Sequence, residues 1–518
     1  MRRAAPDDRP VVLTVAGSDS GGGAGVQADL KTAAAVGAFG TSVVTSVTAQ
    51  HTRGVESTHV LPVAEVEAQL DAVFDDFDVA AVKTGMLATT EIVETVAEYA
   101  AERDVPFVVD PVMVAASGDR LLAPEAESAY ERLIAEATVV TPNADEAAVL
   151  TDIEPASEAD LRAVGEQLVS AGASAALVKG GHVAGDPVCD VLVRRVNDGD
   201  PVQRTNEGDP ARRANEGGPA QRTNEADPTR RADEGDPAQR TNEGDPARRA
   251  DEGNPAQCAS QTFTHPRIDT EATHGSGCTL SSSIAARLAR GRSLSDAVAG
   301  GIDHITRAVR YPLDVGEGPG AVHHAVEVRE RAAREATRET AESVLAQFVT
   351  ADVRPVVPEV GLNLVAATPY AETTGETAAV EGRVTATLSG VQAGRGIRFG
   401  ASSHVARFLL SAREHDPSLR FAVNCRQSDA TVAAMERLDW EAVEIDRSAE
   451  PEPDEEGSTM GWAARRAFEQ TDGTPDAVFD RGDVGKESMI RVLAVDAAEI
   501  ARKVLDLSEQ TRGAARSE

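Results

Sequence analysis

The sequence has few of the features that mark a secreted, zinc-binding or membrane-spanning protein. Its 518 residues include only four cysteines, and none of them forms a Cys-x-x-Cys pair. A disulfide framework or a zinc site is therefore not expected, and a reducing cytoplasm is the expected location. The first ten residues, MRRAAPDDRP, contain no apolar segment of the kind found in signal peptides. The sequence contains no run of about 18 apolar residues, so no membrane-spanning helix is expected.

Basic and aromatic residues are also scarce. There are 85 acidic against 51 basic residues, a formal net charge of −34, and 3% aromatic residues. Nucleic acids and anionic membranes attract basic surfaces, so neither is expected as a partner. Only five basic residues are lysines, and the other 46 are arginines. Excess carboxylate with little lysine indicates a halophilic protein, although a GC-rich genome would also favour arginine over lysine.

One segment almost lacks apolar side chains. A nine-residue unit, as in NEGDPARRA, occurs seven times over 197–259, and Val202 is the only aliphatic residue there larger than alanine. Such a segment cannot bury apolar surface, so we expect a disordered loop; a repeat that binds a partner is the alternative. The flanking CDVLVRRV and QTFTHPRI both look like strands. The repeats are therefore expected to extend the tip of a β-hairpin.

The chain before the repeats alternates between strand-like and amphipathic helical segments. The expected strands are RPVVLTVAG, TSVVTSVTAQ, AAVKTGM, PFVVDPVMV, ATVVTPN and SAALVKGG. This alternation predicts an α/β domain with a mainly parallel sheet, in which ligands bind at the carboxyl ends of the strands.

A second α/β pattern begins near Pro355, after a charged, Ala-rich helical segment. The expected organisation is a domain over 9–323 that contains the repeats, a helical linker over 324–344, and a smaller α/β domain over 345–510.

Two glycine-rich segments come directly before predicted helices. Gly17–Gly25 follows the first strand and matches neither a P-loop nor GxGxxG. The second segment reads THGSGCT over Thr273–Thr279. Successive amides at such a helix start can form an anion hole. Cys278 lies where a thiol pKa tends to fall, so it is a candidate base; a small cysteine buried under a tight turn is the alternative.

The motifs AGSDSGGGAGVQADLKT, VKTGML, VVDPVMVAASGDRLL, VVTPNADEA, VKGGH and THGSGCT occur in family order. In them the chain resembles hydroxymethylpyrimidine/phosphomethylpyrimidine kinases of the ribokinase-like superfamily, over roughly residues 9–320 without the repeats. The resemblance implies two ATP- and Mg²⁺-dependent phosphorylations of the pyrimidine precursor of thiamine. Ser20-Gly21 stands where many members have Pro-Ser.

The resemblance also implies roles for particular residues. Cys278 would deprotonate the hydroxymethyl group. The pyrimidine pocket would be lined by Gly17, Asp29, Gln50 and Met86. The transferred phosphoryl group would be held by Gly275, Ser276 and Gly277.

Four further residues would serve ATP and magnesium. Asp110, Asn143 and Glu146 would organise Mg²⁺ and its waters, because oxygen ligands suit this ion. Lys179 would lie near the ATP phosphates. The alternatives are a strand-end surface lysine at Lys179 and simple helix capping by Asn143 and Glu146.

Cationic residues and glycines are concentrated in the C-terminal region. The motifs FGASSHVAR and GKESMIR resemble the archaeal-type thiamine-phosphate synthase domain, over about 345–507. The family reaction joins pyrimidine diphosphate to thiazole phosphate and releases pyrophosphate. The sequence GDVGKESM departs from the GGxGKEPM of many relatives.

Charge that develops on pyrophosphate needs cationic stabilisation. The candidates for this role are Arg383 and His404, and the candidates for phosphate binding are Lys486 and Arg491. The alternatives are surface ion pairs for the arginines, a surface helix position for His404, and a domain that only binds ligand and regulates the kinase. The expected partners are the aminopyrimidine, ATP and thiazole phosphate, and a homodimer is one option.

Overall fold

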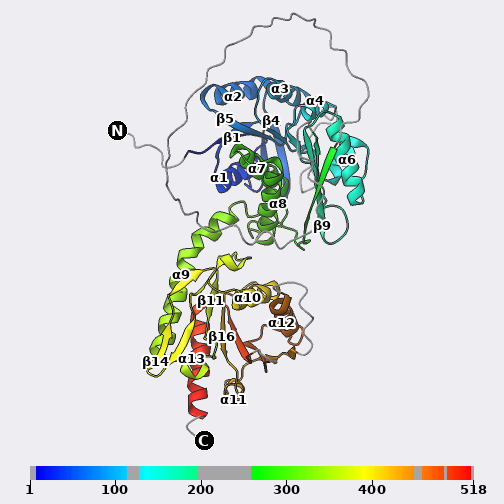
Figure 1. Cartoon of the computed structure of the whole chain (residues 1–518). Coiled ribbons are helices and arrows are strands. Elements are labelled where there is room, and N and C mark those ends of the chain that lie inside the picture. The colour runs from blue at the N-terminus through cyan, green and yellow to red at the C-terminus, as the bar shows by residue number, and fades with distance from the viewer. Residues whose placement is uncertain (1–7, 114–127, 197–257, 448–457, 483–486, 515–518) are drawn as a thin grey trace, which may run out of the picture. The chain divides into compact units, whose positions relative to one another are not determined.

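The structure, a computed structural model, describes residues 8–113, 128–196, 258–447, 458–482 and 487–514 (Figure 1). It divides into two compact units. The first contains Met1–Leu87 and Ile268–Glu518, and the second contains Ala88–Met113 and Leu121–Arg267. Within the described residues, no helix is long and apolar enough to cross a membrane.

The part of the first unit that precedes residue 320 carries the two glycine-rich segments. Its elements are β1 (Val11–Ala16), α1 (Gly25–Val36), β2 (Phe39–Val44), β3 (Ser46–His51), β4 (Gly54–Val60), α2 (Val63–Asp76), β5 (Val79–Thr84), α7 (Ser276–Ala289) and α8 (Leu294–Arg310). Strand β1 pairs in parallel with both β2 and β5. Nearly all of its side chains are buried, as expected for a central strand covered on both faces.

The segment TSVVTSVTAQ forms two strands, so the prediction of one strand there is wrong. Strand β2 ends at Val44, and the next residue, Thr45, bonds through its N–H to the Ala16 carbonyl at 3.0 Å and through its hydroxyl to the Met86 carbonyl at 2.7 Å. Strand β3 then pairs with β4 in a separate antiparallel hairpin. Hence Gln50 lies on this hairpin and not in the main sheet.

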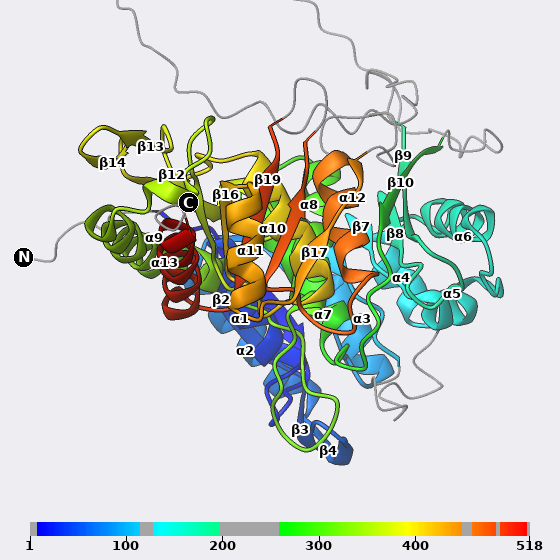
Figure 2. The same cartoon turned by 90° about the horizontal axis from the view of Figure 1, so that it is seen from below.

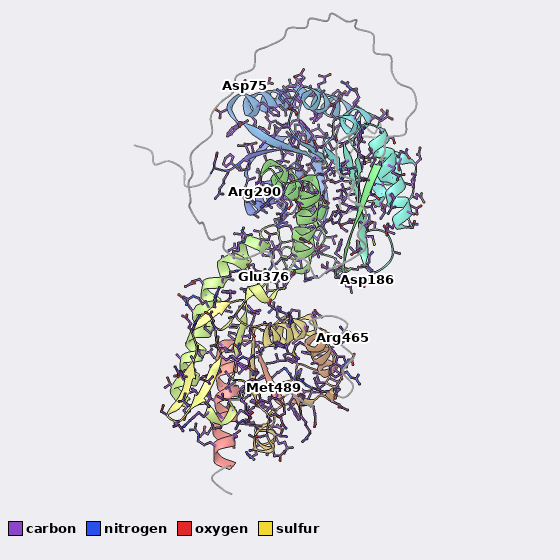
Figure 3. All side chains as sticks on the ribbon, viewed as in Figure 1. Asp75, Asp186, Arg290, Glu376, Arg465 and Met489 are labelled. Carbon is purple, nitrogen blue, oxygen red and sulfur yellow. The ribbon has the colours of Figure 1, made fainter. Side chains whose placement is uncertain are left out.

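Helices α1, α7 and α8 pack side by side (Figure 1). Small buried residues such as Ser281, Ser283 and Ala285 allow α7 to approach its neighbours closely. Arg290, labelled in Figure 3, lies at the end of α7 and donates to the Val36 carbonyl at 2.8 Å. This bond ties the ends of α1 and α7 together, and each of these helices begins at one of the glycine-rich segments.

The second unit continues the predicted βα alternation. Its elements are α3 (Thr90–Ala101), β6 (Phe107–Val109), α4 (Tyr130–Ala135), β7 (Val139–Val140), α5 (Ala144–Thr151), α6 (Glu158–Ser170), β8 (Ala175–Val178), β9 (Val188–Arg195) and β10 (Cys258–His265). Strands β6, β7 and β8 are parallel, and β9 and β10 are antiparallel. The expected α/β fold with a mainly parallel sheet is confirmed.

The strands that flank the repeats pair as predicted. Cys258 lies opposite Arg195, and the antiparallel register continues to His265 opposite Val188. Strand β10 is the edge strand of the sheet. The hairpin is therefore confirmed, whereas the predicted disorder of the repeats concerns residues that lie almost entirely outside the described part of the chain.

The remainder of the first unit forms a second α/β arrangement. Its elements are α9 (Val326–Ala351), η3 (Arg354–Val356), β11 (Leu364–Ala367), η4 (Thr374–Glu376), β12 (Thr377–Val380), β13 (Val384–Thr387), β14 (Gly390–Ala393), β15 (Ile397–Phe399), α10 (His404–His415), β16 (Phe421–Arg426), α11 (Asp429–Arg437), β17 (Ala442–Glu444), α12 (Ser458–Phe468), β18 (Ala477–Asp480), β19 (Met489–Ala494) and α13 (Ala497–Ala514). Seven strands form a mainly antiparallel sheet in the order β15-β12-β11-β16-β19-β18-β17.

Alternate residues of these strands face two separate cores. Leu364 and Ala366 of β11 pack in the core with α9 and α13, whereas Val365 packs in the core with α10 and α12. This alternation follows from the two-residue period of a strand. Helices α9 and α13 lie side by side (Figure 2). Helix α9 therefore extends beyond the predicted linker and helps to cover the second sheet.

Candidate active sites

The residues predicted to bind the pyrimidine come from the ends of β1 and β5, from β3 and, for Asp29, from α1. A Cβ atom on Gly17 would lie 2.6 Å from the Ser46 hydroxyl and 3.1 Å from the Met86 sulfur. Gly17 and Met86 are therefore in close contact, and a side chain at residue 17 would require Ser46 and Met86 to move. Gln50 lies next to Ser20 of the first glycine-rich segment. The Ser20 hydroxyl accepts from the Gln50 N–H at 2.8 Å and donates to the Gln50 carbonyl at 2.7 Å.

Asp29 is placed differently from a substrate-reading carboxylate. It is 2% exposed, and its oxygens accept hydrogen bonds from Thr14 and Ser282 at 2.6 Å each. The Lys83 ammonium, which is fully buried, lies 2.9 Å from both oxygens. Four contacts occupy about all the acceptor positions of a carboxylate. Pyrimidine binding by Asp29 stays a prediction, and its observed contacts join α1 to β1, β5 and α7.

We call Asp29, Thr14, Lys83 and Ser282 the Asp29 cluster. Sequence reasoning missed Lys83 and Ser282 as members of it. A usable signal was present, because Lys83 is one of only five lysines and stands within the apolar strand β5. Ser282 lies one helical turn after Cys278, which places both on the same side of α7. The Asp29 cluster therefore supports the part of α7 that carries Cys278.

The THGSGCT segment forms the start of α7. Gly275 is the N-cap, with φ at +82°, and Ser276, Gly277 and Cys278 are the first three helical residues. The first N–H groups of a helix have no acceptor within the helix. Cys278 is half-buried and forms no disulfide. The three residues predicted to hold the phosphoryl group, Gly275, Ser276 and Gly277, thus lie in the same turn as the predicted base, Cys278.

In the second unit, Lys179 lies between two acidic residues. Its ammonium is 3.4 Å from the Asp110 carboxylate and 3.8 Å from that of Glu146. Asp110 also accepts a hydrogen bond from the Thr141 hydroxyl at 3.3 Å. Burial raises the pKa of Glu146 to about 7, with Lys179 acting in the opposite direction and Asp110 adding to the increase. The structure therefore brings Asp110, Glu146 and Lys179 together.

Asn143 and Glu146 form a capping box at the start of α5. The Asn143 side chain accepts from the Glu146 N–H at 2.9 Å, and the Glu146 carboxylate accepts from the Asn143 N–H at 2.8 Å. The capping alternative is thus observed, and a metal role for these residues stays a prediction. Among the described residues, no group of three or more His, Cys, Asp and Glu side chains is arranged to hold a metal.

The synthase candidates come from different elements of the C-terminal sheet. Arg383 adopts a positive φ of 62° after β12 and donates to the Val360 carbonyl at 2.6 Å. His404 is the exposed first residue of α10, with its Nδ1 3.1 Å from the Ser403 hydroxyl. Both side chains remain on the surface, where a phosphate could reach them.

Arg491 forms an ion pair with Asp480, which is the alternative to phosphate binding that the sequence left open. It is 5% exposed in β19, and its guanidinium lies 3.0 Å from the buried Asp480 carboxylate and over the Phe408 ring. Arg447 holds the same carboxylate at 3.0 Å. Phosphate binding by Arg491 therefore stays a prediction that competes with an observed ion pair, and Lys486 lies outside the described residues.

The fold consists of a first α/β arrangement with a mainly parallel sheet and a second, C-terminal α/β arrangement with a mainly antiparallel sheet. The chain belongs to the phosphomethylpyrimidine kinase family, which it matches over residues 19–209 and 249–323. Residues 341–506 match the family of thiamine-phosphate synthase ThiN. The predicted combination of kinase and synthase is thereby confirmed.

Individual relatives and one solved structure are similar to parts of this chain. The hydroxymethylpyrimidine/phosphomethylpyrimidine kinase of Streptomyces coelicolor is 42% identical over 320 residues, which are 62% of this chain and 96% of that protein. The thiamine biosynthesis bifunctional protein ThiED of Geobacter sulfurreducens is 40% identical over 64% of this chain and 56% of its own length. A crystal structure of phosphomethylpyrimidine kinase from Clostridium difficile 630 is 31% identical, with a TM-score of 0.42, over 58% of this chain and 100% of that one.

Proposed function

We propose that the kinase part transfers a phosphoryl group from ATP to 4-amino-5-hydroxymethyl-2-methylpyrimidine and then to its monophosphate. The observation that best supports this proposal is the start of α7, where a glycine N-cap precedes Ser276, Gly277 and Cys278. The positive end of the helix dipole at this turn attracts a phosphoryl group in transfer, while the Ser276 N–H already donates to the Thr273 carbonyl at 3.0 Å.

Cys278 is the proposed base. Its thiolate accepts the hydroxymethyl proton as the hydroxyl oxygen attacks the terminal phosphorus of ATP, and ADP leaves. The helix dipole favours the anionic thiolate at this position. The bond from the Ser282 hydroxyl to Asp29 holds α7 in place.

Asp110 and Glu146 fit Mg²⁺ because both offer hard oxygen donors. When bound, Mg²⁺ neutralises charge on the phosphates of ATP. Lys179 supplies a cation between the two carboxylates, and its ammonium is the proposed contact for an ATP phosphate. The Asn143 side chain fixes the start of α5 and thereby the position of Glu146.

Replacing Cys278 with Ala tests the base. Kinase turnover should fall by about 10²–10⁴-fold, the usual range for lost general base catalysis. Cys258→Ala on β10 is the matched control and should keep normal turnover. Synthase activity of the same preparation reports intact protein. Near-normal kinase turnover in Cys278→Ala would reject this role for the thiol.

The C-terminal part is proposed to join the pyrimidine diphosphate to thiazole phosphate, with Arg383 and His404 stabilising the departing pyrophosphate. In the full chain, Arg383→Gln or His404→Gln should each lower pyrophosphate release by about 10²–10³-fold. Arg398→Gln is the control, because Arg398 is exposed and already pairs with Glu381 at 3.3 Å. If the unaltered chain bound both substrates but released no pyrophosphate, a regulatory binding domain would replace this proposal.

A further inference from the structure

Asp19 holds the first glycine-rich loop together. It follows β1 and is 1% exposed. One carboxylate oxygen accepts from the Gly21 N–H at 2.8 Å, and the other accepts from the Gly23 and Ala24 N–H groups at 2.9 and 2.7 Å. These bonds fold the loop into the turn that leads into α1.

The same carboxylate reaches the second glycine-rich segment. Its Oδ2 lies 3.0 Å from Nε2 of His274, which must donate because a carboxylate only accepts. Burial acts to raise the pKa of Asp19, but the bonds from His274 and Ala24 outweigh it and lower that pKa. With four contacts made inside the protein, Asp19 is an internal anchor and not a ligand for substrate.

The two glycine-rich segments also meet through their backbones. A Cβ atom on Gly275 would lie 1.9 Å from the Gly23 carbonyl oxygen, and one on Gly23 would lie 2.4 Å from the His274 ring. The buried His324 donates from Nε2 to the same Gly23 carbonyl at 2.9 Å. The Val322 N–H bonds to the His274 carbonyl at 3.3 Å. Three distant segments of the chain therefore converge directly before Cys278.

We propose that Asp19 and His274 are positioning residues for the kinase reaction, because their bond fixes the start of α7 against the first glycine-rich loop. This inference rests on the proposed role of the α7 start. A charge-assisted hydrogen bond is the strongest link between the two segments. A shift of about 1 Å in a reacting group can cost roughly 10²-fold in rate, so losing this bond should act on turnover.

Two substitutions at one residue test the pair. His274→Leu cannot donate a hydrogen bond, and its kcat should fall at least about tenfold while the KM values for both substrates change by less than about threefold. His274→Gln can donate from nearly the position of Nε2 and should recover most of the kcat. Val164→Ala, a buried change on α6, is the control for a general loss of stability. Equal turnover in the Leu and Gln variants would overturn the proposal.

Alkylation gives a second measurement that does not depend on turnover. Iodoacetamide should label Cys278 faster in His274→Leu, with Cys189 labelled at its normal rate. If His274→Leu does not fold, Asp19→Asn is compared with the unaltered chain in the same way, and an unchanged Cys278 rate would overturn the proposal. Cys278→Ala is measured alongside to separate the base role of Cys278 from the positioning role of Asp19 and His274. Normal turnover in Cys278→Ala would reject the base role, and the positioning role would still be decided by comparing His274→Leu with His274→Gln.

Discussion

Lys83→Met would leave the Asp29 carboxylate as an uncompensated buried charge. In the folded protein the side chains of Lys83 and Asp29 are 0% and 2% exposed, and the ammonium lies 2.9 Å from each carboxylate oxygen. After the substitution only the Thr14 and Ser282 hydroxyls would still donate to Asp29. Removing one partner of a buried pair costs about 3–5 kcal/mol, a large part of the 5–15 kcal/mol that typically stabilises a folded protein.

Denaturant unfolding can isolate this effect. Both tryptophans, Trp440 and Trp462, belong to the C-terminal region, so their fluorescence reports that region alone. Circular dichroism reports helices of the whole chain. Lys83→Met should therefore shift the dichroism transition to lower denaturant, and the fluorescence transition shows whether the loss extends to the C-terminal region.

A double variant and an exposed pair serve as controls. Lys83→Met combined with Asp29→Asn removes both charges and should recover part of the lost stability, because no unpaired charge remains buried. Arg162→Met breaks an exposed pair with Glu158 and should cost at most about 1 kcal/mol. A loss below about 1 kcal/mol for Lys83→Met would refute the reasoning, because the pair would then not be shielded from water.

Three further outcomes are expected. The folded-state pKa of Glu146, about 7, lies above its ordinary value, so the folded protein gains stability from this proton at low pH and loses it as pH rises through 7; melting curves of Glu146→Gln should lack that decline. Melting temperature and both activities should rise with KCl as the Debye length falls from about 10 Å at 0.1 M to 3 Å at 1 M, and a flat response would refute salt adaptation. Replacing 197–259 with a short Asn-Gly turn should leave kinase kcat and KM within about threefold, whereas a tenfold loss would place the repeats in the site.

The order of strands and helices could be predicted because apolar periodicity is local information. The hairpin around the repeats could also be predicted, since both of its strands are visible as β-rich segments. The break after Val44 could not, because the contacts around it, such as the Thr45 hydroxyl bond to Met86, join residues far apart in the chain. The same limit applies to His274, whose partner Asp19 lies 255 residues away.

The motifs identified the candidate site residues, but they did not show which side chains are free to bind a ligand. Asp29 and Arg491 have the right chemistry for a polar substrate, yet both are occupied by protein partners. Such occupancy depends on burial, which only the packed structure reveals. Conversely, the place of Cys278 at a helix start could be predicted from sequence, because a glycine-rich helix start is a local pattern, and its role as the base stays a prediction. Mg²⁺, thiazole phosphate, a cytoplasmic location and a homodimer stay predictions.

Few lysines remain in this arginine-rich chain, and those described have specific partners. Lys31 donates to the Gly22 carbonyl at 2.6 Å, and Lys179 lies between Asp110 and Glu146. Lys503 is 4% exposed and donates to the Leu493 carbonyl at 2.8 Å. Each described lysine therefore occupies a position where its compact ammonium contacts protein oxygen atoms.

The surroundings of Lys83 show why arginine would not replace lysine there. The ammonium is fully buried, and a Cβ atom on the neighbouring Gly85 would already approach it to 2.9 Å. A guanidinium is larger and carries five N–H donors in a fixed plane, of which Asp29 could accept only some. The unsatisfied donors would each add a desolvation cost. A composition that disfavours lysine on the surface can thus still require it in the interior, as the buried Lys83 and Lys503 show.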